Sequence, residues 1–585
     1  MNRRKLLSLM GLSPAVFAPS LVFGKSSRDC ASANAPDGKI ETLNPRGTPP
    51  SIKLLPLAPR LDILNGKTVY LVDTGFMGGA AFLKQMQIWF SKNMPDVDIV
   101  FRKKAGPYAE DDPNLWAEIK AKGNAAIMAI GHCSGCTPAT IGHCITVEKM
   151  GIPTTPVVTR AFHDLAVLNA ARRGMPLVRT TFTPHPVWGK TPEELWAYVE
   201  GPDPISGKPM MREIVDALTR PLTEDERKTG EVSVSSGPPT FRDSARNLQQ
   251  YYLDNGMTDY LPIILPTEDS VEEMLKGTSH NPDEAVGKMA AGAFAPWKYT
   301  VRNVAVNAVM AGARPEYFPV ILAIASSGMA SLSSSTNSFA AAAVINGPIR
   351  DKLDMNYGIG AMGPFAQSNA TIGRAWTLMS KNLGNGGIPG DTYNGSQGNN
   401  LNYNNLIVAE HEQANPWNPF HVQKGHKPEE NVVSLFEGLG IHSGEGARNA
   451  GVLENPKFEE QFTSIFGTFI SFFGALVVCD PLVAKRLVEQ GYDTKEKLID
   501  WLYQNTTHTV KDYKNTTHTY SFDYPRALRG EEPWATWYKL PDETMIPRWP
   551  KPDYINVVVA GGETNAFFQA GNLSFRGSIS VDKWM

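Results

Sequence analysis

The sequence predicts an α/β protein with a Rossmann-like parallel sheet in its N-terminal domain, followed by a second, mixed α/β domain. Between residues 66 and 182, short apolar runs alternate with segments of helical spacing. Strand–helix–strand repeats of this kind form parallel sheets with right-handed crossovers. The chain has 585 residues, more than one hydrophobic core usually serves, so we expect two domains plus terminal segments.

Five buried apolar runs are the predicted strands of the first domain, and helical segments separate them. The strands cover residues 68–73, 97–101, 124–130, 153–158 and 177–182, and the helices cover residues 81–93, 114–122, 139–150 and 162–173. In such sheets, ligands bind beyond the carboxyl ends of the strands. The turns at 73–79 and 131–137, which follow the first and third strands, are therefore the expected position of a site.

The chain divides into four predicted parts. These are an export signal at 1–35, the first domain at 36–235, a second α/β domain of unknown function at 246–525 and a C-terminal extension at 526–585. The proline-rich residues 36–65 are interpreted as an extended arm on the first domain, and Ser, Gly and Pro at 233–239 mark the boundary. In the second domain we expect a strand at 261–265, helices at 301–313 and 316–325, a buried strand or helix at 340–345 and a late strand at 555–560.

A basic N-terminus followed by an apolar run is typical of a secretory leader. Arg3-Arg4-Lys5 precedes the apolar run 6–23, which two prolines interrupt. The run is too short and too interrupted to span a bilayer comfortably, and no later segment reaches that length. The pattern looks like a twin-arginine leader, which predicts an exported, periplasmic bacterial protein without stable membrane insertion. The simpler interpretation is a basic N-terminus with no targeting role.

The overall composition is that of an ordinary globular protein. Hydrophobic residues make up 42% and charged residues 20% of the chain, and the net charge is -3. This balance gives no electrostatic case for binding nucleic acid or an anionic membrane. A small-molecule substrate is the expected partner, and a homo-oligomer is left open.

The most specific chemistry lies at residues 131–144, which hold three of the five cysteines and two of the eleven histidines. Five cysteines in so long a chain do not make a disulfide scaffold. Cys30 falls in the predicted leader, and Cys479 lies in an apolar run typical of an inert core thiol. The cluster at 131–144 therefore remains as the candidate for thiol or soft-metal chemistry.

Cys133 and Cys136 form a Cys-x-x-Cys motif just ahead of a predicted helix. Thr137-Pro138 favours a helix that begins after Cys136, because threonine can cap a helix and proline is favoured at its first position. The positive end of that helix favours the thiolate form of Cys136, and His132 could deprotonate Cys133. The motif thus predicts a thiol-dependent oxidoreductase acting on a small molecule, with Cys133, Cys136 and His132 as catalytic residues.

Two other functions stay open for the same residues. A metal-dependent lyase or hydrolase could bind Zn or Cu through Cys133, Cys136, His143 and Cys144, although no cofactor is firmly predicted. Against it, His143 and Cys144 are adjacent on a helix and point about 100° apart. A non-catalytic binding protein could instead use the cysteines as a structural disulfide.

The first domain carries five short motifs in order: Gly66-Lys67-Thr68-Val69, Asp73-Thr74-Gly75-Phe76, residues 131–137, residues 148–154 and Pro184-His185-Pro186. Together they resemble the UGSC family, named for a selenocysteine-Gly-Ser-Cys motif, over about residues 40–220. The resemblance implies that Cys133 stands at the selenocysteine position and Cys136 at the partner cysteine, which favours Cys133 as the attacking group. This chain departs from the motif by reading Cys-Ser-Gly-Cys, without selenium. The resemblance supplies no substrate.

The predicted substrate-binding residues come from both domains: Asp73, Gly75, Gly78, Thr137, His185 and Arg374. The two glycines could cradle an anion or simply make a tight turn. His185 could line the site or be a satisfied loop histidine, and Arg374 could pair with a carboxylate. In the second domain, two carboxylates and two histidines at 410–421 could supply acid–base groups or metal ligands, or could simply end a strand.

Overall fold

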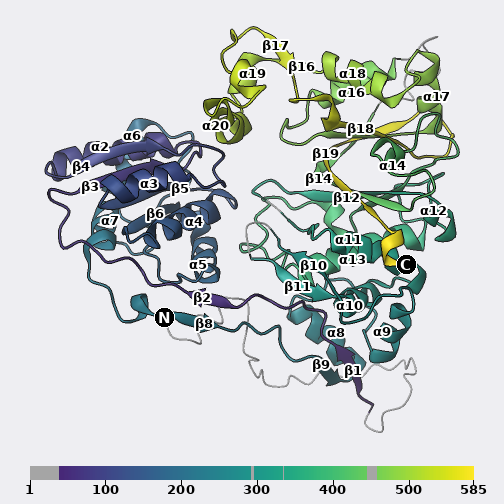
Figure 1. Cartoon of the computed structure of the whole chain (residues 1–585), viewed down its shortest axis with the longest axis horizontal. Helices are drawn as coiled ribbons and strands as arrows, with labels where there is room; N and C mark the ends of the chain where they lie inside the picture. The colour runs from purple at the N-terminus through teal and green to yellow at the C-terminus, as the bar shows by residue number, and fades with distance from the viewer. Residues whose placement is uncertain (1–37, 292–294, 334, 445–456) are drawn as a thin grey trace, which may run out of the picture.

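The computed structural model describes residues 38–291, 295–333, 335–444 and 457–585. The chain forms an N-terminal parallel α/β domain and a larger second region built on a mixed sheet, as Figure 1 shows. The export signal predicted for residues 1–35, together with Cys30, lies outside the described residues. Within the described ranges, no helix is both long enough and apolar enough to cross a bilayer.

The N-terminal domain contains the predicted parallel sheet. Its strand order is β4-β3-β5-β6-β7, and every neighbouring pair is parallel. The strands are β3 (Thr68–Asp73), β4 (Asp98–Lys103), β5 (Ala125–Gly131), β6 (Thr154–Thr159) and β7 (Thr181–Thr183). The last strand is shorter than predicted because residues 175–178 form a turn, closed by a hydrogen bond from the Val178 N–H to the Met175 carbonyl.

Helices cover both faces of this sheet, which confirms the Rossmann-like architecture. Val69 and Leu71 of β3 pack into one apolar cluster, while Tyr70 and Val72 pack into another on the opposite face, as the two-residue period of a strand requires. The first cluster includes residues of α2 (Gly79–Asn93), α6 (Pro192–Glu200) and α7 (Met210–Thr219). The other face is covered by α3 (Pro113–Lys122), α4 (Cys136–Glu148) and α5 (His163–Arg172).

Two antiparallel strand pairs carry the chain between the regions, below both of them in Figure 1. The pairs are β1 (Ile40–Leu43) with β9 (Thr240–Asp243), and β2 (Ile52–Leu54) with β8 (Gly230–Val232). The arm predicted on the first domain therefore divides between two regions. Leu43 donates its N–H to the Pro266 carbonyl, and Thr48 donates to Lys298, so residues 40–48 lie on the second region. An extended segment pairs with any strand edge that the fold places beside it. The local sequence therefore does not determine which region the segment joins.

The six-stranded sheet of the second region has two halves of the same topology. Its order is β13-β12-β14-β19-β15-β18. In each half, two parallel strands lie next to a third, antiparallel strand, and the two antiparallel strands pair at the centre. The first half contains β12 (Ala340–Asn346), β13 (Leu406–Ala409) and β14 (Val432–Ser443), and the second contains β15 (Ala475–Cys479), β18 (Ile555–Val559) and β19 (Phe568–Ser580). Residues 526–585, predicted as an extension, thus supply two strands of this sheet.

The predicted strand at 261–265 does not form. Pro262 has no N–H to donate to a neighbouring strand, and the Ile263 carbonyl instead accepts a hydrogen bond from the Gln249 side chain. Residues 340–345, predicted as a buried strand or helix, form strand β12. The late strand predicted at 555–560 is confirmed as β18.

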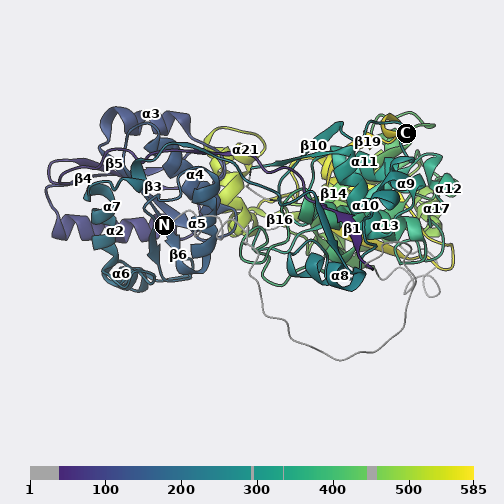
Figure 2. The ribbon, with the colours of Figure 1, turned by 90° about the horizontal axis from the view of Figure 1, so that it is seen from below.

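Helices of the second region surround its sheet and reach toward the N-terminal domain. They include α8 (Ala245–Asp254), α9 (Glu268–Leu275), α10 (Val301–Ala311), α11 (Phe318–Ser326), α12 (Ile349–Lys352), α13 (Gln367–Asn382), α14 (Phe420–Gln423), α16 (Phe458–Phe466), α17 (Pro481–Glu489) and α18 (Lys495–Asn505). A final helical segment comprises α19 (Val510–Lys514), η5 (Thr519–Asp523), α20 (Tyr524–Leu528) and α21 (Trp534–Trp537). Figures 1 and 2 both place this segment on the side of the second region that faces the N-terminal domain.

Candidate functional site

The Cys-x-x-Cys motif lies at the carboxyl end of β5, the central strand of the parallel sheet. Cys133 and Cys136 are joined as a disulfide, and their Cα atoms are 5.3 Å apart. Cys133 is 8% exposed, while Cys136 is completely buried. The two cysteines therefore have different access to a reactant, and Cys133 is the one that a small molecule could reach.

Helix α4 begins at Cys136, with Gly135 as the residue that precedes its first turn. This corrects the prediction that Thr137 caps the helix and that Pro138 is its first residue. Pro138 instead occupies the third helical position. The first N–H groups of a helix have no partner within it, so a proline is tolerated throughout the first turn.

Backbone N–H groups point at both sulfur atoms. The Cys136 N–H, at the start of α4, lies 3.0 Å from the Cys133 Sγ, and the His132 N–H lies 3.1 Å from the Cys136 Sγ. Hydrogen bonds at a helix N-terminus stabilise negative charge on sulfur. The helix therefore favours the thiolate of Cys133, whereas the sequence predicted that Cys136 would benefit.

The His132 ring is buried and lies between two other rings. It stacks on Phe76 at 5.1 Å and on His185 at 4.5 Å between ring centroids. Its Nε2 accepts a hydrogen bond from the Val187 N–H at 3.0 Å, which places the ring proton on Nδ1. Burial, and secondarily the neighbouring His185, lower the pKa of His132 to about 4. At neutral pH the ring is uncharged, and its unprotonated nitrogen, Nε2, already accepts the Val187 N–H. The geometry therefore favours a positioning role for His132 over a role as a general base.

His185 lies at the exposed rim of the same site. Its Nδ1 is 3.1 Å from the Thr159 hydroxyl at the end of β6, and partial burial lowers its pKa. The predicted position of His185, beyond the last strand and beside the motif, is thus what the structure shows.

Asp73 ends strand β3 and is completely buried. One carboxylate oxygen accepts the Gly75 N–H at 3.0 Å, and the other has no hydrogen-bond partner. Burial raises the pKa of Asp73. The turn that follows needs its glycines, because Gly75 and Gly78 have φ angles of +94° and +85° and a Cβ at Gly78 would lie 3.0 Å from the Trp188 backbone.

Four buried polar atoms at this edge of the sheet have no hydrogen-bond partner. They are the Asp73 Oδ2, Ser134 Oγ, Thr137 Oγ1 and Thr183 Oγ1 atoms. Asp73 and Thr183 end strands β3 and β7, and Ser134 and Thr137 lie in the loop and the helix that follow β5. Buried polar groups are nearly always paired in native proteins, so this concentration indicates a place where a polar ligand supplies the missing partners.

The alternative set of metal ligands is not brought together. Both ring nitrogens of His143 face acceptors, the Asp111 carboxylate at 3.0 Å and the Tyr108 carbonyl at 2.9 Å. Cys144 points into the apolar core between α3, α4 and the sheet, where burial raises its thiol pKa. Across the residues that the structure describes, no group of three or more His, Cys, Asp or Glu side chains could hold a metal ion.

Arg374 does not join the cysteine site. It lies on α13 in the second region, where its guanidinium forms two bonds to Asp259, at 2.8 and 3.0 Å, and one to the Pro262 carbonyl. Arg374 thus pairs with a carboxylate of the chain itself and not with one of a substrate. This pair fixes α13 against the segment that contains Asp259.

Tyr108 is a site residue that the sequence did not reveal. A Cβ at Gly135, between the two cysteines, would lie 2.5 Å from its hydroxyl oxygen, so Tyr108 packs directly on the motif. Buried Lys104 shapes the loop that carries Tyr108 by donating to four carbonyls, and burial lowers the pKa of Lys104 to about 8. The Tyr108 ring also contacts Phe522 of the second region, with ring centroids 5.0 Å apart. A lysine and a tyrosine in a polar loop gave no signal of this placement.

The fold and the site define a doubly wound α/β domain with paired cysteines at the carboxyl edge of its sheet. Residues 41–204 of the chain match the model of the UGSC family, which confirms the resemblance over that segment. No curated protein and no solved structure matched the chain. The matched segment ends within the N-terminal domain, so the second region is described by its structure alone.

Proposed function

We propose that the protein is a thiol-dependent oxidoreductase that acts on a small molecule through Cys133 and Cys136. The observation that carries this proposal is the cysteine pair at the carboxyl end of β5, in which each sulfur accepts a backbone N–H. A structural bridge would not need donors aimed at its sulfurs, whereas a pair that cycles through thiolate does.

The two cysteines have distinct roles in this proposal. Cys133 attacks, because it is the exposed member and its sulfur faces the first N–H of α4. Cys136 resolves, because it is inaccessible to reactants but bonded to Cys133. His132 positions the loop through its bond to Val187.

The electrons balance for a small disulfide as the oxidised substrate. The Cys133 thiolate attacks one substrate sulfur, the substrate S–S bond breaks, and the leaving thiolate takes a proton from solvent. The Cys136 thiolate then attacks the Cys133 sulfur, forms the Cys133–Cys136 bond and releases the second thiolate. Two electrons pass from the protein to the substrate, and an external dithiol returns the pair to its reduced form.

The unpaired polar atoms around the motif support a polar substrate. Asp73, with its raised pKa, and the hydroxyls of Ser134, Thr137 and Thr183 would supply its hydrogen-bond partners. A homo-oligomer stays a prediction, to be checked by sedimentation of the full chain.

The test is the reaction of the reduced full-length protein with an aromatic disulfide, followed by peptide mass spectrometry. We expect the wild type to reduce the reagent and to end with the Cys133–Cys136 bond. Cys133→Ser should lose the reaction, and Cys136→Ser should stop at a mixed disulfide on Cys133. Cys479→Ser is the matched control, because Cys479 is a buried thiol at the end of β15 in the second region.

Three results would contradict the proposal. An unchanged rate in Cys133→Ser would remove the attacking thiol. A bridge that resists strong reductant until the protein unfolds would support the structural disulfide. One metal ion per chain, together with free thiols on denaturation, would support the metal-dependent alternative.

We also propose that the protein is exported through a twin-arginine leader. The Arg3-Arg4-Lys5 sequence and the short apolar run support this, and a cysteine pair in the disulfide form suits an oxidising compartment. Cell fractionation should place a shortened chain in the periplasm, and Arg3→Lys with Arg4→Lys should retain it in the cytoplasm. A full-length wild-type chain in the cytoplasm would refute export.

A further inference from the structure

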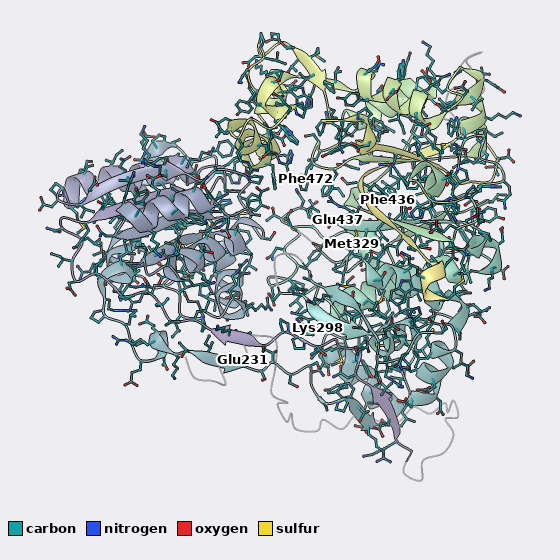
Figure 3. The ribbon with its side chains drawn as sticks, viewed as in Figure 1. Glu231, Lys298, Met329, Phe436, Glu437 and Phe472 are labelled. Carbon is teal, nitrogen blue, oxygen red and sulfur yellow. A yellow bond between two sulfur atoms is a disulfide. The ribbon has the colours of Figure 1, made fainter. Side chains whose placement is uncertain are left out.

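A cavity of about 340 Å³ lies in the second region, and no residue of the cysteine motif lines it. Its walls come from β19, from the loop before β15, from the helical segment that includes α19, α20 and α21, and from residues 548–554. Its aromatic and basic side chains include Phe472, Tyr513, Arg526, Trp534, Arg548, Lys551 and Arg576. Figure 3 shows Phe472 on the side of the second region that faces the N-terminal domain.

The cavity lining has more basic than acidic groups. Two of its cations are neutralised within the chain, Lys551 by Asp553 at 2.7 Å and Arg576 by Glu437 at 2.8 Å. Arg526 is weakly paired, because its nearest carboxylate, Glu531, is 4.0 Å away. The positive charge left in the lining is on Arg526 and Arg548. Asp523, a buried carboxylate that also lines the cavity, pairs with neither arginine and lies 3.4 Å from His518.

Arg548 is the least compensated of these groups. No carboxylate among the described residues forms an ion pair with it, its Nε is buried without a hydrogen-bond partner, and one terminal nitrogen donates to the Phe469 carbonyl. Burial lowers the pKa of Arg548, but a guanidinium still remains charged at neutral pH. A desolvated charge without a counter-ion is strongly unfavourable, so an anion in the cavity would stabilise the folded state.

Aromatic rings form the rest of the wall. The Arg526 guanidinium lies 4.7 Å from the Trp534 ring centroid, Tyr513 is buried, and Phe472 is partly exposed. Flat aromatic walls favour planar groups by stacking, and the arginine fork favours carboxylate or phosphate oxygens. The lining thus combines recognition of a ring with recognition of an anion.

We propose that this cavity binds a small organic anion that carries a planar ring, with its carboxylate or phosphate against Arg548 and Arg526 and its ring against Trp534. The site is separate from the cysteine motif and does not depend on the proposed oxidoreductase function. Its volume is at the lower end of the usual range for ligand pockets, about 300–1,000 Å³, which restricts the ligand to a compact molecule.

The test measures binding of benzoate, phenyl phosphate and benzamide to the full chain by ligand-observed NMR and calorimetry. Benzamide matches benzoate in shape but has no charge. We expect at least one of the two anions to bind at millimolar concentration or tighter and benzamide to bind about tenfold more weakly or not at all. Whichever anion binds better identifies the oxygen group that the arginines recognise.

Variants assign the binding to the cavity. Arg548→Met should weaken binding of the anion about tenfold or more, and Arg526→Gln should weaken it to a smaller extent. Arg212→Gln is the control, because Arg212 is a 70% exposed side chain on α7 of the other domain. If Arg548→Met fails to fold by circular dichroism, the partly exposed Arg526 carries the test. The proposal is overturned if neither anion binds, if benzamide binds equally, or if the folded variants bind as the wild type does.

Discussion

Two buried carboxylates, one in each region, occupy similar places in their sheets but have opposite surroundings. Asp73 ends β3 and Glu410 directly follows β13, and both are completely buried. Glu410 accepts four hydrogen bonds, from Lys495 at 3.0 Å, Asn415 at 2.9 Å, Asn346 at 2.7 Å and the Phe420 N–H at 2.6 Å. Asp73 accepts a single one, from Gly75.

This difference separates a structural group from one that is available to a ligand. The two oxygens of Glu410 are saturated and its charge is paired with Lys495. Glu412 is similarly occupied by the Gly347 N–H at 2.8 Å and by Arg350 at 3.1 Å. Glu410 and Glu412 thus hold the second sheet together, whereas Asp73 and its unpaired neighbours keep polar atoms that a ligand could bind at the first sheet.

The largest effect on the free energy of unfolding should come from removing Lys495, the cation that pairs with Glu410. Lys495→Met leaves the Glu410 charge buried without its cation, and removing one partner of a buried pair costs about 3–5 kcal/mol of unfolding free energy. Urea unfolding of the variant measures this loss. The double variant Glu410→Gln with Lys495→Met should recover most of it, because no unpaired charge remains. A loss under about 1 kcal/mol in the single variant is typical of an exposed ion pair, and it would mean that the Glu410–Lys495 pair is accessible to water.

The next effect is the acid sensitivity of His132. Its pKa in the folded protein is about 4, against 6.5 ordinarily. Above pH 6.5 the ring is neutral in both states, and between pH 6.5 and 4 only the unfolded state takes up a proton. The unfolding free energy that the neutral His132 ring contributes is therefore lost as the pH falls, and this loss is at most about 3 kcal/mol. The unfolding free energy of His132→Gln, measured over this pH range, should decline less than that of the wild type; parallel curves would contradict the buried neutral ring.

A smaller effect, of opposite sign in pH, should come from Asp73. Because burial raises its folded-state pKa, the unfolded state loses its proton first as the pH rises above about 4, and stability falls with rising pH. Asp73→Asn should remove this decline and keep or raise the unfolding free energy at neutral pH by about 1 kcal/mol. It should also slow disulfide exchange about tenfold. Gln249→Ala, in α8 of the second region, serves as the control for exchange. Loss of stability without loss of exchange would assign Asp73 a structural role like that of Glu410.

The smallest effect should come from the contact between the two regions. Arg529 pairs with Glu110 at 2.9 Å, and both side chains are more than a third exposed. Exposed ion pairs contribute about 0–1 kcal/mol, so Arg529→Gln should change thermal unfolding little and leave exchange unaltered. A loss several times larger would show that the helical segment and the N-terminal domain unfold as one unit.

The sequence by itself determined the local structure of the N-terminal domain. Apolar runs of strand length and helical spacing placed β3 with its observed bounds and the other strands within a few residues. The exception was β7, whose first predicted residues form a turn. The parallel topology followed from that alternation, and the topology in turn predicted that Asp73, the cysteine motif and His185 share one edge of the sheet. Each of these inferences depends on residues that are close in sequence.

The tertiary structure alone decided what each of these groups can do. The sequence did not show that the Cys133 sulfur would receive the N–H of Cys136, that His132 would be neutral or that Tyr108 would pack on Gly135. The same is true of the symmetric second sheet, whose central β14 and β19 are far apart in the chain. Burial, pairing and pKa depend on which distant segments exclude water from a group. That information belongs to the packing of the whole chain and not to any short stretch of it.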